Sequence, residues 1–173
     1  MRKIQVIFIV GKSGSGKTSI SKMLGEYFEC DVLSFSKIGR KTGENISIKE
    51  INMIHNQIIK CICEKICTDQ FIIVEGIASI DVLRSIKEKY DTVTFFINVP
   101  LTDRISRIAE RECCTYSCAK EIEYAKERGK QKVGLDKVIE EADEVVNGRG
   151  DLKEILANMI YKMTEYMDVE NGY

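Results

Sequence analysis

Residues 11–18 combine glycines, hydroxyls and lysines in a spacing that suits phosphate chemistry. Their order, GKSGSGKT, fits the pattern G-x-x-x-x-G-K-[ST] of a phosphate-binding loop (P-loop) at every required position. Glycines let the backbone fold closely around a polyphosphate, so that successive N–H groups point at its oxygens. We therefore predict a nucleoside triphosphate site with the following phosphate-contacting residues: Gly11, Ser13, Gly14, Ser15, Gly16, Lys17, Thr18 and Ser19.

Two side chains of this loop and one later carboxylate have more specific predicted roles. Lys17 would reach the β- and γ-phosphates of ATP, and the Thr18 hydroxyl would be a ligand of Mg²⁺. Glu75 follows the apolar run 71–74 and precedes a glycine, which is where P-loop proteins hold the metal or its waters. The alternative for Glu75 is a solvated strand end. We expect ATP and Mg²⁺ as cofactors, Thr18 and Glu75 as the metal site, and Lys17 and Glu75 as catalytic residues.

Arginines recur on one face of a predicted helix that begins just beyond a strand. Arg104, Arg107 and Arg111 are spaced i, i+3 and i+7. Phosphoryl transfer spreads charge over the oxygens of the moving group, and arginines on a mobile lid would supply positive charge after closure. The alternative is a solvated helix face paired with nearby acidic residues. We predict Arg104 and Arg107 as catalytic lid residues and leave Arg111 open between the two interpretations.

The elements that position these residues follow from apolar periodicity. Continuous apolar runs predict strands buried on both faces, and apolar residues every three to four positions predict helices. Strands are expected over residues 4–10, 30–34, 70–75, 92–99 and 144–147. Helices are expected over 18–28, from 47 onward, over 80–89, over 102–141 with interruptions near 113–117 and 129–134, and from 151. The alternation predicts an α/β fold of three layers, of the P-loop NTPase type: a five-stranded parallel sheet with helices on both faces and a helical lid.

Composition and charge disfavour several classes of protein. The chain has 26 basic and 27 acidic residues, which argues against non-specific binding to nucleic acid or membranes. The sequence shows neither an apolar leader nor a membrane-spanning run, and its seven cysteines suit reduced thiols, so we expect a cytoplasmic protein. It contains no Asn-Lys-x-Asp motif to read guanine, which disfavours a GTPase. We expect a monomer or a weak dimer.

Three separated blocks carry a family resemblance. The first is residues 7–18, and the second runs from the apolar run 95–99 through Pro100 to Arg104 and Arg107. The third lies over residues 127–152 and includes ADEVVN followed by GDL. Together they resemble the P-loop nucleotide kinases, the group that contains adenylate kinase, cytidylate kinase and dephospho-CoA kinase. The resemblance implies one kinase domain over residues 1–173, with an acceptor-binding excursion at about 35–67 and a lid at about 104–134.

The resemblance also implies further site residues. Arg40, with Ser36, would bind the acceptor, and the loop of Asn147 and Gly148 would lie against adenine. Adenylate kinase has DGFPR where this chain has EGIAS at 75–79, so one acceptor-phosphate arginine is missing. Dephospho-CoA kinases carry an aspartate after the second strand that accepts a hydroxyl proton, whereas SFSK at 34–37 contains no carboxylate. A phosphate acceptor needs no base, so we predict that the acceptor presents a phosphate.

The predicted function is transfer of the γ-phosphoryl group of Mg·ATP to a small molecule, a nucleotide or nucleotide-like compound. One alternative is a dephospho-CoA kinase-like transfer to a hydroxyl group, with Glu75 as the base. Another is an ATP-binding sensor without turnover, which would need the P-loop but would have no use for the lid arginines.

Cysteines and the single histidine are predicted to be structural. Cys113, Cys114 and Cys118 fall where some adenylate kinases hold zinc. Structural zinc needs two close pairs of ligands, or three thiolates and a histidine, so we predict no zinc and buried or half-buried thiols. His55 lies along an apolar stripe and is predicted to be a partly buried residue of the helix.

Overall fold

The computed structural model describes residues 4–35, 48–66 and 71–168, and this part of the chain forms one parallel β-sheet. The strand order is β2-β3-β1-β4-β5, and every neighbouring pair is parallel. The strands are β1 (Val6–Val10), β2 (Val32–Ser34), β3 (Ile72–Glu75), β4 (Thr92–Asn98) and β5 (Glu144–Asn147). All five lie within the ranges predicted from the apolar runs, so the predicted sheet is confirmed.

The helices also follow the predicted periodicity. In the described residues they are α1 (Lys17–Phe28), α2 (Ile48–Ile66), α3 (Ile80–Lys87), α4 (Leu101–Glu112), α5 (Tyr116–Lys132), α6 (Leu135–Glu140) and α7 (Leu152–Asp168). The long charged stretch after β4 thus divides into three helices. Cys113 has a φ of 51° and Gly134 a φ of 99°, and these left-handed residues interrupt the helical backbone at the two breaks.

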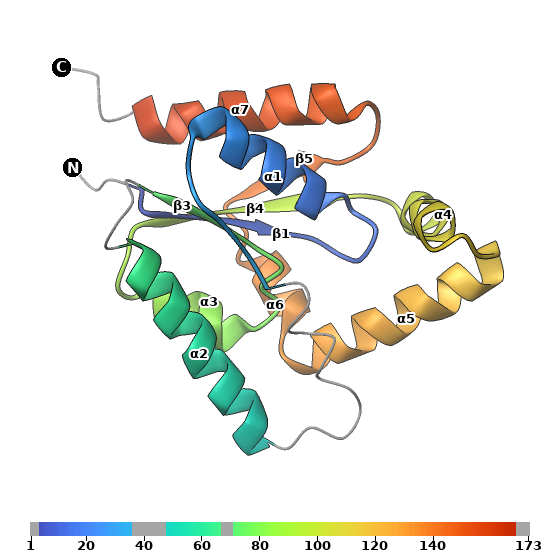
Figure 1. Ribbon diagram of the computed structural model, residues 1–173, viewed down its shortest axis with the longest axis horizontal. Helices are drawn as coiled ribbons and strands as arrows, with labels where there is room; N and C mark the ends of the chain where they lie inside the picture. Colours follow the sequence, from blue (N-terminus) through green and yellow to red (C-terminus); the bar gives the residue numbers. More distant parts are fainter. Residues whose placement is uncertain (1–3, 36–47, 67–70, 169–173) are drawn as a thin grey trace.

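Alternating side chains of β1 belong to two separate cores. Val6, Phe8 and Val10 pack in the core that α2, α3 and α6 cover, whereas Ile7 and Ile9 pack in the core that α1 and α7 cover. Figure 1 shows these two sets of helices on opposite sides of the sheet. Because both faces are buried, β1 is apolar throughout, and the residues that follow it are held at a rigid sheet edge.

The helical hairpin of α4 and α5 lies to one side of this three-layer body (Figure 1). It has a small hydrophobic cluster of its own, formed by Ile105, Ile108 and Ala119. Of the predicted acceptor-binding excursion, the structure describes Phe35 and residues 48–66; Ser36 and Arg40 lie outside the described residues. Among the described helices, none has the length and apolar character needed to cross a membrane.

Candidate active site

The P-loop joins the buried strand β1 to the first turn of α1, as its pattern predicts. Gly14 has a φ of 82°, and a Cβ atom there would lie 2.6 Å from the carbonyl oxygen of Arg104. A larger residue would be strained in this conformation and would collide with the backbone of α4. The loop therefore packs directly against the first turns of α4 and presents the N-terminal end of α1 at the sheet edge, where anions are favoured.

Lys17 is buried at the start of α1, with 9% of its surface exposed. Burial, together with the nearby Lys130 ammonium, lowers the pKa of Lys17 to about 8. The Glu75 and Glu127 carboxylates act in the opposite direction, but they do not offset the burial. A desolvated ammonium of this kind is stabilised when a polyanion binds beside it, so the position of Lys17 suits a phosphate ligand.

Glu75 lies beside the P-loop because of the strand register. It is aligned with Ile9 on one side and with Ser34 on the other, and it is fully buried. Its Oε1 atom accepts hydrogen bonds from the Thr18 hydroxyl, at 3.3 Å, and from the Ser34 hydroxyl. Sequence reasoning missed Ser34, because the pairing of β2 with β3 is what places its hydroxyl here.

The oxygens around Glu75 fit the predicted magnesium site. Within the described part of the chain, the Oε2 atom of Glu75 is buried without a hydrogen-bond partner. Such an atom costs free energy that a bound cation would recover. Carboxylate and hydroxyl oxygens are also the ligands that Mg²⁺ accepts. Thr18 and Glu75, with Ser34 nearby, therefore have the chemistry to hold Mg²⁺ next to a phosphate.

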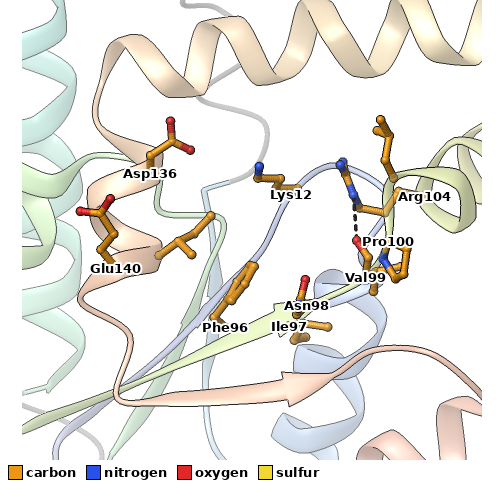
Figure 2. Close-up of a pocket in the computed structure, with 11 residues that line it drawn as sticks. Lys12, Phe96, Ile97, Asn98, Val99, Pro100, Arg104, Asp136 and Glu140 are labelled. Atoms are coloured by element: carbon orange, nitrogen blue, oxygen red, sulfur yellow. Dashed lines mark hydrogen bonds between the residues drawn. The ribbon is translucent and has the colours of Figure 1, made fainter.

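Arg104 is buried and hydrogen-bonded within the protein, whereas the predicted lid arginine would have a guanidinium free to contact a phosphate. The Nε atom of Arg104 donates to the carbonyl oxygen of Val99 at 3.2 Å (Figure 2). Its Nη1 atom donates to the carbonyl oxygen of Ser13 at 3.1 Å and to the buried Glu123 carboxylate. The guanidinium thus joins the end of β4, the P-loop and α5. Since the guanidinium is buried and already paired with Glu123, the catalytic role of Arg104 stays a prediction.

Arg107 lies one turn further along α4 and is half-buried. Its Nη2 atom donates to the carbonyl oxygen of Gly148 at 2.9 Å, and its Nη1 atom lies 3.5 Å from the carbonyl oxygen of Ser15. The side chain therefore bridges the P-loop and the loop after β5. Asn147 is exposed, and its side-chain oxygen accepts from the backbone N–H of Arg149. The structure brings Arg107, the P-loop and Gly148 together.

Two residues of α5 reach the P-loop without having been predicted as site residues. The backbone N–H of Ser13 donates to Glu127 Oε1 at 2.8 Å. Lys130 Nζ lies 2.9 Å from the Ser13 hydroxyl oxygen and 2.9 Å from Glu127 Oε1. Burial opposes ionisation of Glu127, but Lys130 and the Ser13 N–H outweigh it, so the pKa of Glu127 lies below its usual value. The i, i+3 spacing of this pair was visible in the sequence, but nothing there identified its partner.

A pocket of about 540 Å³ lies beside the P-loop on the side of α6 (Figure 2). Asp136 and Glu140 line it from α6, and Lys12 extends into it between these carboxylates and Arg104. Two carboxylates repel a polyphosphate. The carboxylates make this pocket unsuited to a polyphosphate, and the binding of phosphates by the P-loop amides near Lys17 stays a prediction.

A second pocket lies between α2 and α5. Its lining is mostly apolar and consists of Phe35, Ile54, His55, Ile58, Gly76, Ile77, Ala78, Ser79, Val82, Gly129, Lys130 and Val133. His55 is half-buried, as predicted, and burial lowers its pKa. Lys130 lines this pocket and also contacts Ser13, so one side chain joins the wall of the pocket to the P-loop.

The cysteines of the lid differ from their prediction. Cys113 and Cys118 are exposed and only Cys114 is half-buried, so buried or half-buried thiols were a wrong expectation for the first two. They lie at the corner between α4 and α5, outside the two cores of the sheet. In the residues that the structure describes, His, Cys, Asp and Glu side chains form no group of three that could hold a metal. The absence of zinc stays a prediction.

The fold is shared with solved structures of kinases. A gluconokinase from Sinorhizobium meliloti is similar with a TM-score of 0.64 and 14% identity, over 99% of this chain and 98% of that one. A shikimate kinase from Bacteroides thetaiotaomicron is similar with a TM-score of 0.63 and 13% identity, over 93% and 98% of the two chains. A shikimate kinase from Aquifex aeolicus is similar with a TM-score of 0.54 and 15% identity, over 92% of this chain and 96% of that one. No protein-family model and no curated protein sequence matches this chain.

At these identities the likeness concerns the fold. The chain has the fold of the P-loop kinases, and the predicted fold class and the resemblance to that group are confirmed at this level.

Proposed function

We propose that the chain is an ATP-dependent small-molecule kinase with its active site at the P-loop. The observation that carries this proposal is one cluster at the sheet edge: the Lys17 ammonium, the Thr18 hydroxyl and a Glu75 carboxylate, one buried oxygen of which has no hydrogen-bond partner among the described residues. A magnesium-bound triphosphate needs these groups. The solved structures with the same fold and kinase names support the same class of reaction.

In the proposed reaction, an acceptor oxygen forms a bond to the γ-phosphorus of ATP while the bond to the β–γ bridging oxygen breaks, leaving ADP. Lys17 would neutralise charge on the β- and γ-phosphates, and Thr18 and Glu75 would hold Mg²⁺, which would supply further positive charge when bound. Arg107 is the lid arginine that we assign to the nucleotide, because its guanidinium already lies between Ser15 and Gly148.

The acceptor, in this proposal, binds between α2 and α5 and presents a phosphate to Arg40. Lys130 links the wall of that pocket to the P-loop, and the pocket has a mostly apolar lining. Arg40→Lys should raise the acceptor's KM strongly and leave the KM for ATP nearly unchanged, because only the planar guanidinium holds two phosphate oxygens at once. Initial rates with each substrate varied in turn measure both constants. If Arg40 is only a solvated charge on a loop, Arg40→Lys should change neither KM value.

The deciding experiment is ADP production from ATP across nucleoside monophosphates, nucleosides, dephospho-CoA, gluconate and shikimate. Turnover with a nucleoside monophosphate supports the proposal. Turnover with a hydroxyl compound alone, abolished by Glu75→Gln, would favour the hydroxyl acceptor with Glu75 as base. Tight ATP binding without ADP production from any compound would favour the sensor.

A further inference from the structure

The lid helix α5 carries an acidic residue whose contact with the P-loop resembles that of a ligand. We propose that the Glu127 carboxylate occupies a phosphate position of the P-loop in the empty protein, and that an arriving phosphate group replaces it and pairs with Lys130. This inference rests on the proposed phosphate site, but it requires only binding and no turnover.

The first observation that supports the inference is the hydrogen bond between the Ser13 N–H and Glu127. P-loop N–H groups donate to phosphate oxygens, and here the Ser13 N–H donates to a carboxylate oxygen at 2.8 Å. A carboxylate is an anionic acceptor like a phosphate, so the two compete for one donor. Lys130 lies 2.9 Å from both Glu127 Oε1 and the Ser13 hydroxyl, which places an ammonium next to the contested position.

The contact of Glu127 is also incomplete. Glu127 is 7% exposed, and within the described part of the chain its Oε2 atom is buried without a hydrogen-bond partner. A permanent structural carboxylate is usually satisfied at both oxygens, because a buried unpaired oxygen is costly. Glu123, one turn earlier on α5, pairs with Arg104, whose side chain is 6% exposed, whereas Lys130, the partner of Glu127, is 20% exposed. We infer that Glu123 fixes the helix and that Glu127 is exchangeable.

Charge explains why an exchange is required. Without a ligand, Glu127 offsets the positive charge of Lys130 and, more weakly, that of Lys17. A phosphate at the Ser13 N–H would meet the carboxylate at close range, and two anions there repel. Departure of Glu127 leaves Lys130 as the cation for the phosphate. Since both residues are on α5, phosphate binding is thereby coupled to the position of the lid helix.

The test compares affinities for Mg·pyrophosphate and Mg·ATP by titration calorimetry. Glu127→Gln keeps the shape of the side chain and removes its charge, so it should bind both probes about fivefold tighter or more. Lys130→Ala should weaken binding by a similar factor, and Lys130→Arg should restore most of it. Glu121→Gln, at an exposed position of the same helix, is the matched control and should change neither affinity.

Unchanged or weaker pyrophosphate binding by Glu127→Gln, with normal binding by the wild type, would overturn the inference and leave the proposed function standing. If Glu127→Gln does not fold, Lys130→Ala decides, and unchanged affinity in that variant overturns the inference. If Glu127→Gln binds the probes more tightly but the wild type turns over no acceptor, the inference is supported and the proposed kinase is contradicted. Failure of both probes to bind the wild type would overturn both.

Discussion

At the scale of single residues, Lys17 carries its charge in a place that disfavours charge. Its pKa is lowered to about 8 by burial and by Lys130, although two carboxylates lie near enough to oppose the shift. The folded protein therefore keeps an ammonium that is less stable than one in water. A bound polyphosphate would remove that disadvantage, so the same burial that lowers stability favours the ligand.

Lys17→Met should lower kcat/KM for phosphoryl transfer about 10²-fold or more, because it removes a preorganised cation that stabilises the charge on the phosphoryl group in the transition state. The melting temperature without ligand should stay the same or rise, since methionine fills similar space without a buried charge. Thermal melts with and without Mg·ATP check this, and the stabilisation by ATP in the wild type should be lost. Near-normal turnover would rule out the P-loop as the active site.

The pKa of Lys17 also predicts a pH dependence. Below about pH 8 the lysine of the free protein is protonated and ready for phosphate; above it, the proton is lost. Bound phosphate favours the charged form and raises the pKa, so binding of Mg·ATP should weaken as pH rises through 8 and should take up protons there. Calorimetry in buffers of different ionisation enthalpy measures that uptake. Lys17→Arg, which stays charged, should show none at this pH.

At the scale of elements, the P-loop and the lid hairpin form one connected unit. The Arg104 guanidinium bonds to the carbonyl oxygens of Val99 and Ser13 and to the Glu123 carboxylate. Gly14 brings the loop backbone against the same turn of α4. The shape of the predicted phosphate site therefore depends on a buried ion pair between α4 and α5, outside the P-loop itself.

Arg104→Ala should destabilise the protein by about 3–5 kcal/mol, because it leaves the Glu123 carboxylate buried without its partner. The double replacement Arg104→Met with Glu123→Leu should recover much of that loss, since neither buried charge remains. Urea denaturation of the three proteins measures the free energy of unfolding. A large fall in kcat with unchanged stability would instead support the prediction that Arg104 acts on the phosphoryl group.

At the scale of the whole molecule, the site forms where distant segments meet at one sheet edge. Residues 11–18 follow β1, Glu75 ends β3, α4 follows β4, and Gly148 follows β5. Arg107 contacts two of these segments, through Ser15 and Gly148. It is therefore the arginine whose position depends most directly on how the complete fold is assembled.

Arg107→Ala should lower kcat by about 10²-fold and weaken ATP binding much less, because cationic contacts to the moving group strengthen in the transition state. Steady-state kinetics and separate calorimetry of ATP without acceptor distinguish the two effects. Arg84→Ala is the matched control, since Arg84 is exposed and pairs with Glu141 on the surface. An unchanged kcat with reduced stability would mean that Arg107 only ties the two loops together.

The fold and the predicted class of ligand follow from local patterns in the sequence. The apolar runs of β1 and β3 are continuous up to Glu75, because strands buried on both faces favour apolar side chains, and β4 is apolar in the main although it contains the buried Thr94. The P-loop spacing is local as well, since strand, loop and helix follow one another within residues 6–28. Lys17 and Thr18 follow one predicted strand and Glu75 ends another, and the carboxyl ends of parallel strands lie at the same edge of a sheet. The order of residues is therefore enough to predict that these three side chains lie at one sheet edge.

Tertiary packing, in contrast, selects the charges that face the P-loop. Arg104 and Arg107 lie on the same face of one helix, yet one is buried against Glu123 and the other bridges Ser15 and Gly148. Glu127 lies 114 positions from Ser13 in the chain, and Ser34 lies 41 positions from Glu75. Periodicity gives the face of a helix on which a side chain lies, but not the partner opposite, because that depends on how helices and strands far apart in the chain pack together.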